Sequence, residues 1–79
     1  MSTKTFTVAP ASPNRINIYD AMTGNLYKVI TLPTGSQIVT SPVVFGDGFS
    51  ITIKEPSGTY MVTYGFPTCN IRSKSHISS

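Results

Sequence analysis

The fold is decided by the stretch Ser41-Pro42-Val43-Val44-Phe45-Gly46-Asp47-Gly48-Phe49-Ser50-Ile51-Thr52-Ile53-Lys54. An apolar run leads into a Gly-Asp-Gly sequence, and strict alternation of apolar and polar residues follows. Because strand side chains alternate between the two faces of a sheet, Phe49, Ile51 and Ile53 share one face. The pattern predicts a β-hairpin, in which Gly46 and Gly48 supply the positive φ angles of a tight turn.

The composition of the whole chain is that of a β protein. Valine, isoleucine and threonine together number 25 (6 + 8 + 11), against two leucines, three alanines and one glutamate. Branched side chains suit a pleated sheet and lose rotamer freedom in a helix, and no window has the apolar spacing of a helix. We therefore expect an all-β fold, a single small antiparallel β-meander, sandwich or barrel of about five strands with extended N- and C-terminal arms.

Turn residues that recur about every ten positions divide the chain. They predict an N-terminal arm over residues 1–14, an antiparallel β domain over residues 15–67 and a polar C-terminal tail over residues 68–79. The arm either pairs on a sheet edge, of this chain or of a neighbour, or is a frayed terminus. The tail is serine-rich and weakly basic, so we expect it to be mobile until it meets a partner. The strands expected in the domain are residues 15–20, 26–32, 37–45, 49–54 and 59–65.

Three details of these strands follow from the sequence. Residues 26–32 carry apolar groups on both faces, which is typical of a strand buried on both sides. Pro42 cannot donate a backbone hydrogen bond, so residues 37–45 are expected at an edge or to contain a bulge. Gly24 or Asn25 is the natural left-handed residue of the first turn.

The size and charge of the chain favour assembly. A chain of 79 residues buries only about 60–65% of its unfolded surface, and such small domains commonly depend on disulfides, a metal or oligomerisation. Cys69 is the single cysteine and His76 the single histidine, which excludes an internal disulfide and argues against a closed zinc site. Charged residues are 11% of the chain, against roughly 25% in an average domain. Sparse charge suits a surface that neighbouring chains cover.

The residues able to carry chemistry form no catalytic pattern. The only acids, Asp20, Asp47 and Glu55, lie in turns or beside them, where a structural role outweighs acid–base work. Cys69 with His76 as base would make a nucleophile, but both lie in the expected tail, where nothing holds them together. We therefore predict no catalytic, cofactor-binding or metal-binding residue, and a protein that is not an enzyme.

Aromatic and basic residues are the candidates for contacts with partners. The aromatic row of Tyr60 and Tyr64 either packs within the sheet, which we favour, or stacks sugar rings or bases. The side chains of Arg72 and Lys74 are either solvated or bind a phosphate group or an acidic group of a neighbouring protein. The residues that we expect to take part in interactions are Phe6, Val8, Tyr60, Tyr64, Arg72 and Lys74.

Part of the chain resembles one blade of a β-propeller of the PQQ or WD-like type. The resemblance lies in Arg15-Ile16-Asn17-Ile18-Tyr19-Asp20-Ala21-Met22-Thr23-Gly24 followed by Val39-Thr40-Ser41-Pro42-Val43-Val44-Phe45-Gly46-Asp47, and it extends to Tyr64. A propeller needs several blades and this chain has one, so the resemblance implies a ring of identical chains. It carries over no ligand residue.

By its general character the chain also resembles the small β-rich virion proteins of tailed bacteriophages, which decorate heads or sit in tails and baseplates. The similar features are the Lys-Thr-Phe-Thr-Val opening, the Ser/Thr-rich strands, the few charges and the trailing tail. The resemblance implies a non-enzymatic structural protein that assembles in multiple copies by strand and arm contacts with itself and with a capsid or tail protein. The alternative is a small binding module for nucleic acid or carbohydrate that uses Tyr60, Tyr64 and the basic tail.

The sequence also gives an expected location. No charged-then-apolar leader is present, and no apolar run approaches the roughly 20 residues that span a bilayer. We therefore expect a protein that is synthesised in the host cytoplasm, is not secreted, has no transmembrane segment and ends in the virion.

Overall fold

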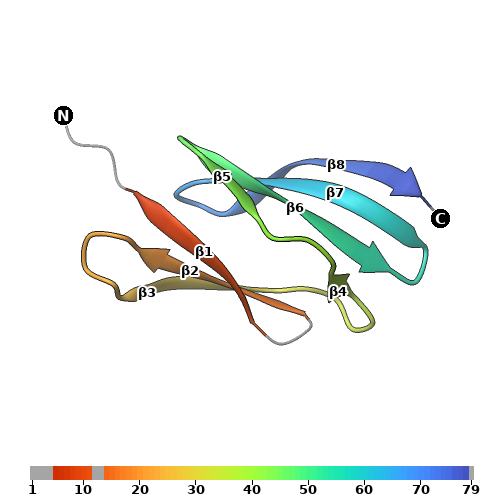
Figure 1. The fold of residues 1–79 in the computed structure, drawn as a ribbon, viewed down its shortest axis with the longest axis horizontal. Helices are drawn as coiled ribbons and strands as arrows, with labels where there is room; N and C mark the ends of the chain where they lie inside the picture. The colour runs from red at the N-terminus through yellow and green to blue at the C-terminus, as the bar shows by residue number, and fades with distance from the viewer. Residues whose placement is uncertain (1–4, 12–13, 79) are drawn as a thin grey trace.

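A computed structural model describes residues 5–11 and 14–78, in which all regular structure is β-strand (Figure 1). The strands are β1 (Phe6–Ala11), β2 (Arg15–Asp20), β3 (Leu26–Thr31), β4 (Gln37–Ile38), β5 (Val43–Phe45), β6 (Gly48–Glu55), β7 (Gly58–Gly65) and β8 (Asn70–Ser78). They form two antiparallel sheets, one in the order β1-β2-β3 and one in the order β4-β6-β7-β8, with β5 also paired to β6. The all-β class is confirmed, and the described residues form eight strands rather than about five.

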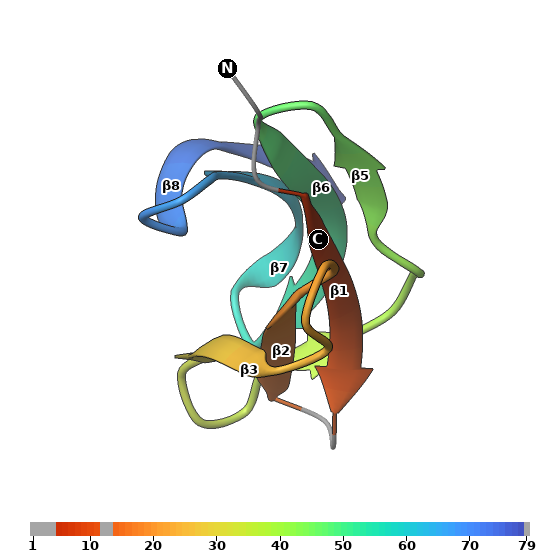
Figure 2. The same cartoon turned by 90° about the vertical axis from the view of Figure 1, so that its left-hand side faces the viewer.

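The two sheets face each other and enclose one core (Figure 2). This arrangement is a two-layer sandwich, because each sheet buries the apolar face that it could not hide alone. The smaller sheet contributes Ile16 and Ile18 of β2, which are completely buried. The buried hydrophobic residues are Phe6, Ile16, Ile18, Leu32, Phe49, Ile51, Ile53, Val62, Tyr64 and Cys69.

The predicted hairpin is present as β5 and β6. Phe45 pairs with Gly48, and the row Phe49, Ile51 and Ile53 is at most 2% exposed, so the predicted inward face is confirmed. The predicted role of the turn glycines is wrong, since neither Gly46 nor Gly48 has a positive φ. Gly48 is needed for space instead: a Cβ there would run into the carbonyl oxygen of Tyr64 on the neighbouring strand.

The strands of the smaller sheet differ from expectation at one point. β2 has the predicted bounds, and Gly24 is the left-handed residue of the following turn, with φ 77°. β3 was expected to be buried on both sides, and this prediction is wrong. It lies at the edge of its sheet, where Leu26 and Val29 are largely exposed.

The strand predicted for residues 37–45 is interrupted near Pro42. It forms two short strands, β4 and β5, that pair in turn with the same edge of β6. Because proline has no backbone N–H, a break at an edge is one of its two expected placements. The edge prediction for Pro42 is confirmed.

Both expected arms contain paired strand. β1 lies along β2, so residues 6–11 of the N-terminal arm pair on an edge of their own chain; residues 1–4 and 12–13 lie outside the described part. The prediction of a mobile tail from Thr68 onward needs correction, since Asn70–Ser78 form β8 along β7 (Figure 1). Residue 79 lies outside the described part.

Substitution of Gly48 tests the close approach of β6 to β7. Gly48→Ala is expected to lower the free energy of unfolding by about 1–3 kcal/mol, because the added methyl group has no room. Gly46→Ala is the matched control, since nothing lies within 4 Å of its Cβ position, and it is expected to change stability by at most about 0.5 kcal/mol. Urea unfolding of both variants makes the comparison, and equal losses would contradict the steric explanation.

Candidate functional site

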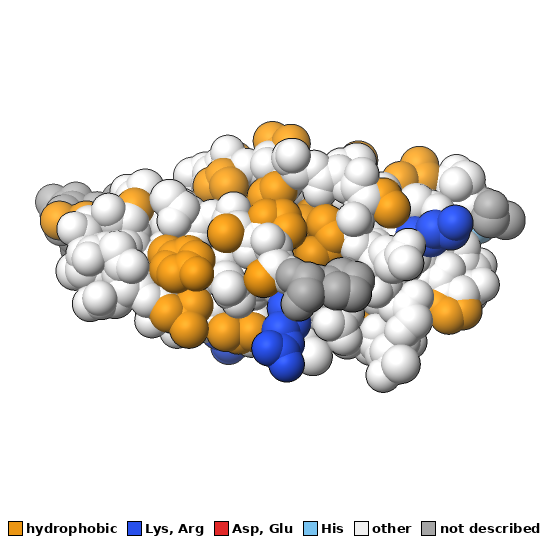
Figure 3. Space-filling model, turned by 60° about the horizontal axis from the view of Figure 1, so that its bottom comes forward, with side chains coloured by type: hydrophobic (Ala, Val, Ile, Leu, Met, Phe, Trp, Pro, Cys, Tyr) orange, Lys and Arg blue, Asp and Glu red, His pale blue; other side chains and the backbone are white. Residues whose placement is uncertain are grey.

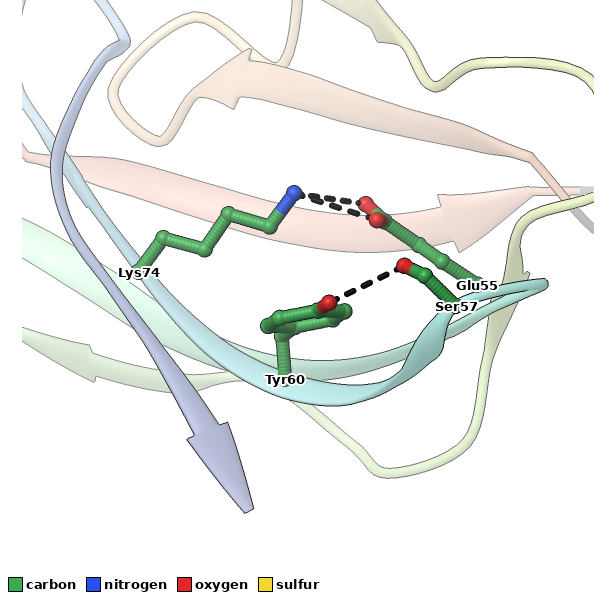
Figure 4. A network of polar contacts seen from close by, with 4 residues as sticks. All are labelled: Glu55, Ser57, Tyr60 and Lys74. Carbon is green, nitrogen blue, oxygen red and sulfur yellow. Dashed lines mark hydrogen bonds and ion pairs between the residues drawn. The ribbon is translucent and has the colours of Figure 1, made fainter. Parts of the chain in front are cut away.

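Two ion pairs connect β8 to the ends of β6 across the intervening strand β7. Arg72 Nη1 lies 2.9 Å from Asp47 Oδ2, in the turn before β6. Lys74 Nζ lies 2.9 Å and 3.1 Å from the two carboxylate oxygens of Glu55, the last residue of β6 (Figure 4). Two of the three acids in the chain are therefore used to hold β8 in place.

The side chains of β7 leave room for these contacts. A Cβ at Gly65 would collide with the guanidinium group of Arg72, so the missing side chain is what lets Arg72 cross the strand. Further along, Lys74 Nζ lies 4.6 Å from the centre of the Tyr60 ring, a cation–π contact. The Tyr60 hydroxyl is 2.9 Å from Ser57 Oγ (Figure 4).

The electrostatics of the first pair follow from this geometry. The hydrogen bond from Arg72, together with its charge, lowers the pKa of the Asp47 carboxyl below its ordinary value. Asp47 is exposed, so the effect on stability is screened by solvent. The structure thus pairs Arg72 and Lys74, both predicted interaction residues, with carboxylates of the same chain.

The remaining predicted interaction residues lie mostly in the core. Phe6 and Tyr64 are buried, so their rings contact other rings of this chain rather than a partner. The Phe6 ring is 4.5 Å from that of Phe66, and Tyr64 stacks on Phe49 at 5.0 Å. Val8 packs against the core and is half-buried.

Tyr60 is the exception among the predicted aromatic residues. It is half-buried, and its ring lies against the ring of His76, with 5.1 Å between the ring centres. It also pairs with Ile53 of β6 and packs against the core, so its contacts come from within the chain. The aromatic row of β7 serves packing at Tyr64 and a polar network at Tyr60.

The groups considered for catalysis are far apart. Cys69 is buried before β8, burial raises the pKa of its thiol, and its Sγ donates to the Pro67 carbonyl oxygen at 3.8 Å. His76 lies near the other end of β8, roughly 20 Å along an extended strand. Among residues 5–11 and 14–78, no cluster of three or more His, Cys, Asp or Glu side chains could hold a metal ion. The geometry keeps the Cys69 thiol away from the His76 imidazole.

A shallow hollow of about 310 Å³ lies beside the connection from β3 to β4. All of its lining residues are neutral, so it offers hydrogen-bonding groups without charge or an aromatic ring. They are Asn14, Thr34, Gly35, Ser36 and Gln37.

Exposed hydrophobic side chains on the outermost strands were not singled out from the sequence. They occupy β3, β5 and β8, each of which lies at the edge of its sheet. Hydrophobic side chains also gather on the face shown in Figure 3, where the visible charged groups are Lys and Arg. The sequence signals were the apolar groups on both faces of residues 26–32 and the unbroken Val43-Val44-Phe45. The exposed residues on these strands are Leu26, Tyr27, Val29, Val43, Val44, Phe45, Ile71 and Ile77.

Comparison of the chain with family models, with curated proteins and with solved structures gave no match. Within the described residues, no helix has the length and apolar character needed to cross a membrane. The stretch from Arg15 to Tyr64 that resembles a propeller blade is divided between the two sheets, whereas a blade is a single four-stranded sheet.

The Arg72–Asp47 pair predicts a specific pH dependence. Because the carboxyl pKa is lowered in the folded state, the pair stabilises the fold above the ordinary pKa of Asp, about 3.9, and this stabilisation disappears as pH falls through the lower folded value. Arg72→Gln is expected to raise the Asp47 pKa towards 3.9, as measured by NMR titration of the carboxyl carbon. Lys74→Gln is the control, since Lys74 pairs with Glu55. An unchanged Asp47 pKa in Arg72→Gln would contradict the pairing.

Proposed function

We propose that the chain is a non-enzymatic structural protein that assembles in multiple copies through strand contacts. The observation that carries this proposal is the coincidence of exposed hydrophobic side chains with open strand edges on β3, β5 and β8. Its partners are further copies of itself and a larger protein of the same assembly. By the resemblance noted from the sequence, that assembly is a phage particle, in its head or its tail.

Strand edges of this kind favour association. An edge strand presents unpaired backbone N–H and C=O groups, and natural proteins usually protect such edges with charges, proline or bulges. In β5 all three residues are hydrophobic and exposed, from 40% at Phe45 to 65% at Val43. A neighbouring strand would cover both the backbone groups and the apolar side chains, so these edges support assembly.

The distribution of charge supports the same proposal. Asp47 and Glu55 are neutralised by cations of the same chain, and the overall charge is sparse. Copies of the chain therefore meet with little electrostatic repulsion, because exposed charges of one sign are few. The small core adds a reason for assembly, since burying apolar area between chains contributes about 25 cal/mol per Å².

The binding-module alternative has less support. Tyr64 is buried and stacked on Phe49, which removes it from any surface for sugars or bases. The cations Arg72 and Lys74 form ion pairs with carboxylates of the same chain, so neither side chain is available to bind a phosphate group. Of the two rings expected in such a module, Tyr60 alone is partly accessible, and one ring does not make a stacking platform.

The mass of the purified chain in solution tests the proposal. Light scattering behind a sizing column is expected to show an average mass above that of one 8.5 kDa chain, rising with concentration. Raised salt is the control, because association through apolar edges should persist where weak charge contacts are screened. A monodisperse monomer that melts well above the range of ordinary mesophilic domains would contradict it.

A further inference from the structure

Ser36 carries a buried hydroxyl group that has no hydrogen-bond partner among the residues the structure describes. The residue is 3% exposed, and its Oγ atom makes no hydrogen bond to any of them. Buried polar groups in folded proteins are nearly always hydrogen-bonded, so an unpaired hydroxyl calls for an explanation. Ser36 also lines the hollow beside the connection from β3 to β4. A molecule bound in that hollow would supply the missing partner.

The hollow lies where the chain crosses from the smaller to the larger sheet (Figure 1), and its walls are held by backbone contacts. On one side, the carbonyl oxygen of Asn14 accepts a hydrogen bond of 2.8 Å from the backbone N–H of Leu32. On the other, a backbone hydrogen bond of 3.1 Å closes the turn of residues 33–36, in which Gly35 has φ 91°. A Cβ at Gly35 would lie 3.2 Å from Cγ of Pro56, so this turn rests on the hairpin between β6 and β7. The hollow is therefore formed before any ligand arrives, as most small-molecule sites are.

The lining residues decide which class of ligand fits. They are Asn14, Thr34, Gly35, Ser36 and Gln37, and none is charged. An ion would lose its hydration there without gaining a counter-charge, and an apolar molecule would leave the Ser36 hydroxyl unpaired. Hydroxyl groups donate and accept hydrogen bonds, as do the groups on serine, threonine, asparagine and glutamine side chains. The lining therefore favours a neutral ligand that carries several hydroxyl groups.

The volume of the hollow sets the size of that ligand. It is about 310 Å³, at the lower end of the roughly 300–1,000 Å³ typical of small-molecule sites. One water molecule takes up only about 30 Å³ in the liquid, so the hollow has room for much more than a single water. A ligand of the size of one sugar residue fits this space.

We infer that the hollow binds one residue of a neutral sugar and that a sugar hydroxyl pairs with Ser36 Oγ. The oxygen is covered by its neighbours in the free chain, so binding includes a rotation about χ1 to another of the three staggered positions of a serine side chain. Because the hollow is shallow, the rest of a glycan can extend from the bound residue into solvent. The site is separate from Tyr60, Tyr64 and the basic tail, and the proposed assembly does not depend on it.

Titration of the isotope-labelled full chain followed by amide NMR spectra tests the site. The probes are the methyl glycosides of glucose, galactose, mannose and N-acetylglucosamine at millimolar concentrations. At least one is expected to give saturable shifts centred on residues 14 and 34–37. Glycerol at the same concentrations is the control, because it carries hydroxyl groups but no sugar ring. No saturable shift with any of the four glycosides, or equal shifts with glycerol, would overturn the inference.

Replacement of Ser36 tests the role of its hydroxyl group. Ser36→Ala is expected to raise the dissociation constant of the bound glycoside about fivefold, as the loss of one hydrogen bond would. The urea midpoint of the free variant is expected not to fall, because the hydroxyl has no partner to lose. Ser75→Ala is the matched control, since Ser75 is exposed on β8, and it is expected to bind as the parent chain does. An unchanged dissociation constant in Ser36→Ala, or a lower urea midpoint, would overturn the assignment of Ser36.

Discussion

The structure depends on the burial of one face of β6. Phe49, Ile51 and Ile53 point from this strand into the space between the sheets, where they meet the fully buried Ile16 and Ile18 of β2. Burying a side chain of this size contributes about 1.5–3 kcal/mol, so a one-residue slip of β6 would turn its whole inner row to solvent. Strands pair with β6 on both sides, β7 on one and β4 with β5 on the other. The rest of the larger sheet is arranged around it.

The sequence predicted those parts of the fold whose cause is local. Alternation places Ile16 with Ile18, and Tyr64 with its row on β7, on one face of a strand whatever the rest of the chain does. The strand β8 could not be found in this way, because residues 70–78 have no apolar alternation. The ion pairs that hold it join residues 25 and 19 positions apart, Arg72 with Asp47 and Lys74 with Glu55.

The candidate site was predictable in its residues but not in its geometry. Tyr60 and Lys74 were singled out as separate features, and the structure brings the ammonium group to 4.6 Å from the ring centre. Whether a surface cation is free depends on gaps such as Gly65, which opens the path of Arg72 across β7. The spacing of residues along the sequence does not show which cation will cross a strand at a missing side chain. The apolar groups on both faces of residues 26–32 were misinterpreted for a related reason, since burial on both sides and exposure at an edge give the same pattern.

The free energy of association limits how tightly a single strand edge can bind a partner. Ile71 and Ile77 on β8 are each a little over half exposed, so covering both side chains on two copies of the chain would contribute roughly 3–6 kcal/mol at about 1.5–3 kcal/mol per buried side chain. Association costs about 4–15 kcal/mol in lost freedom of the two partners, and each backbone hydrogen bond returns only about 1 kcal/mol. A contact through the edge of β8 is thus weak by itself. A stable assembly of this chain needs the apolar edges of β3 or β5 as well, which is the arrangement expected of a protein that is held in place by several neighbours at once.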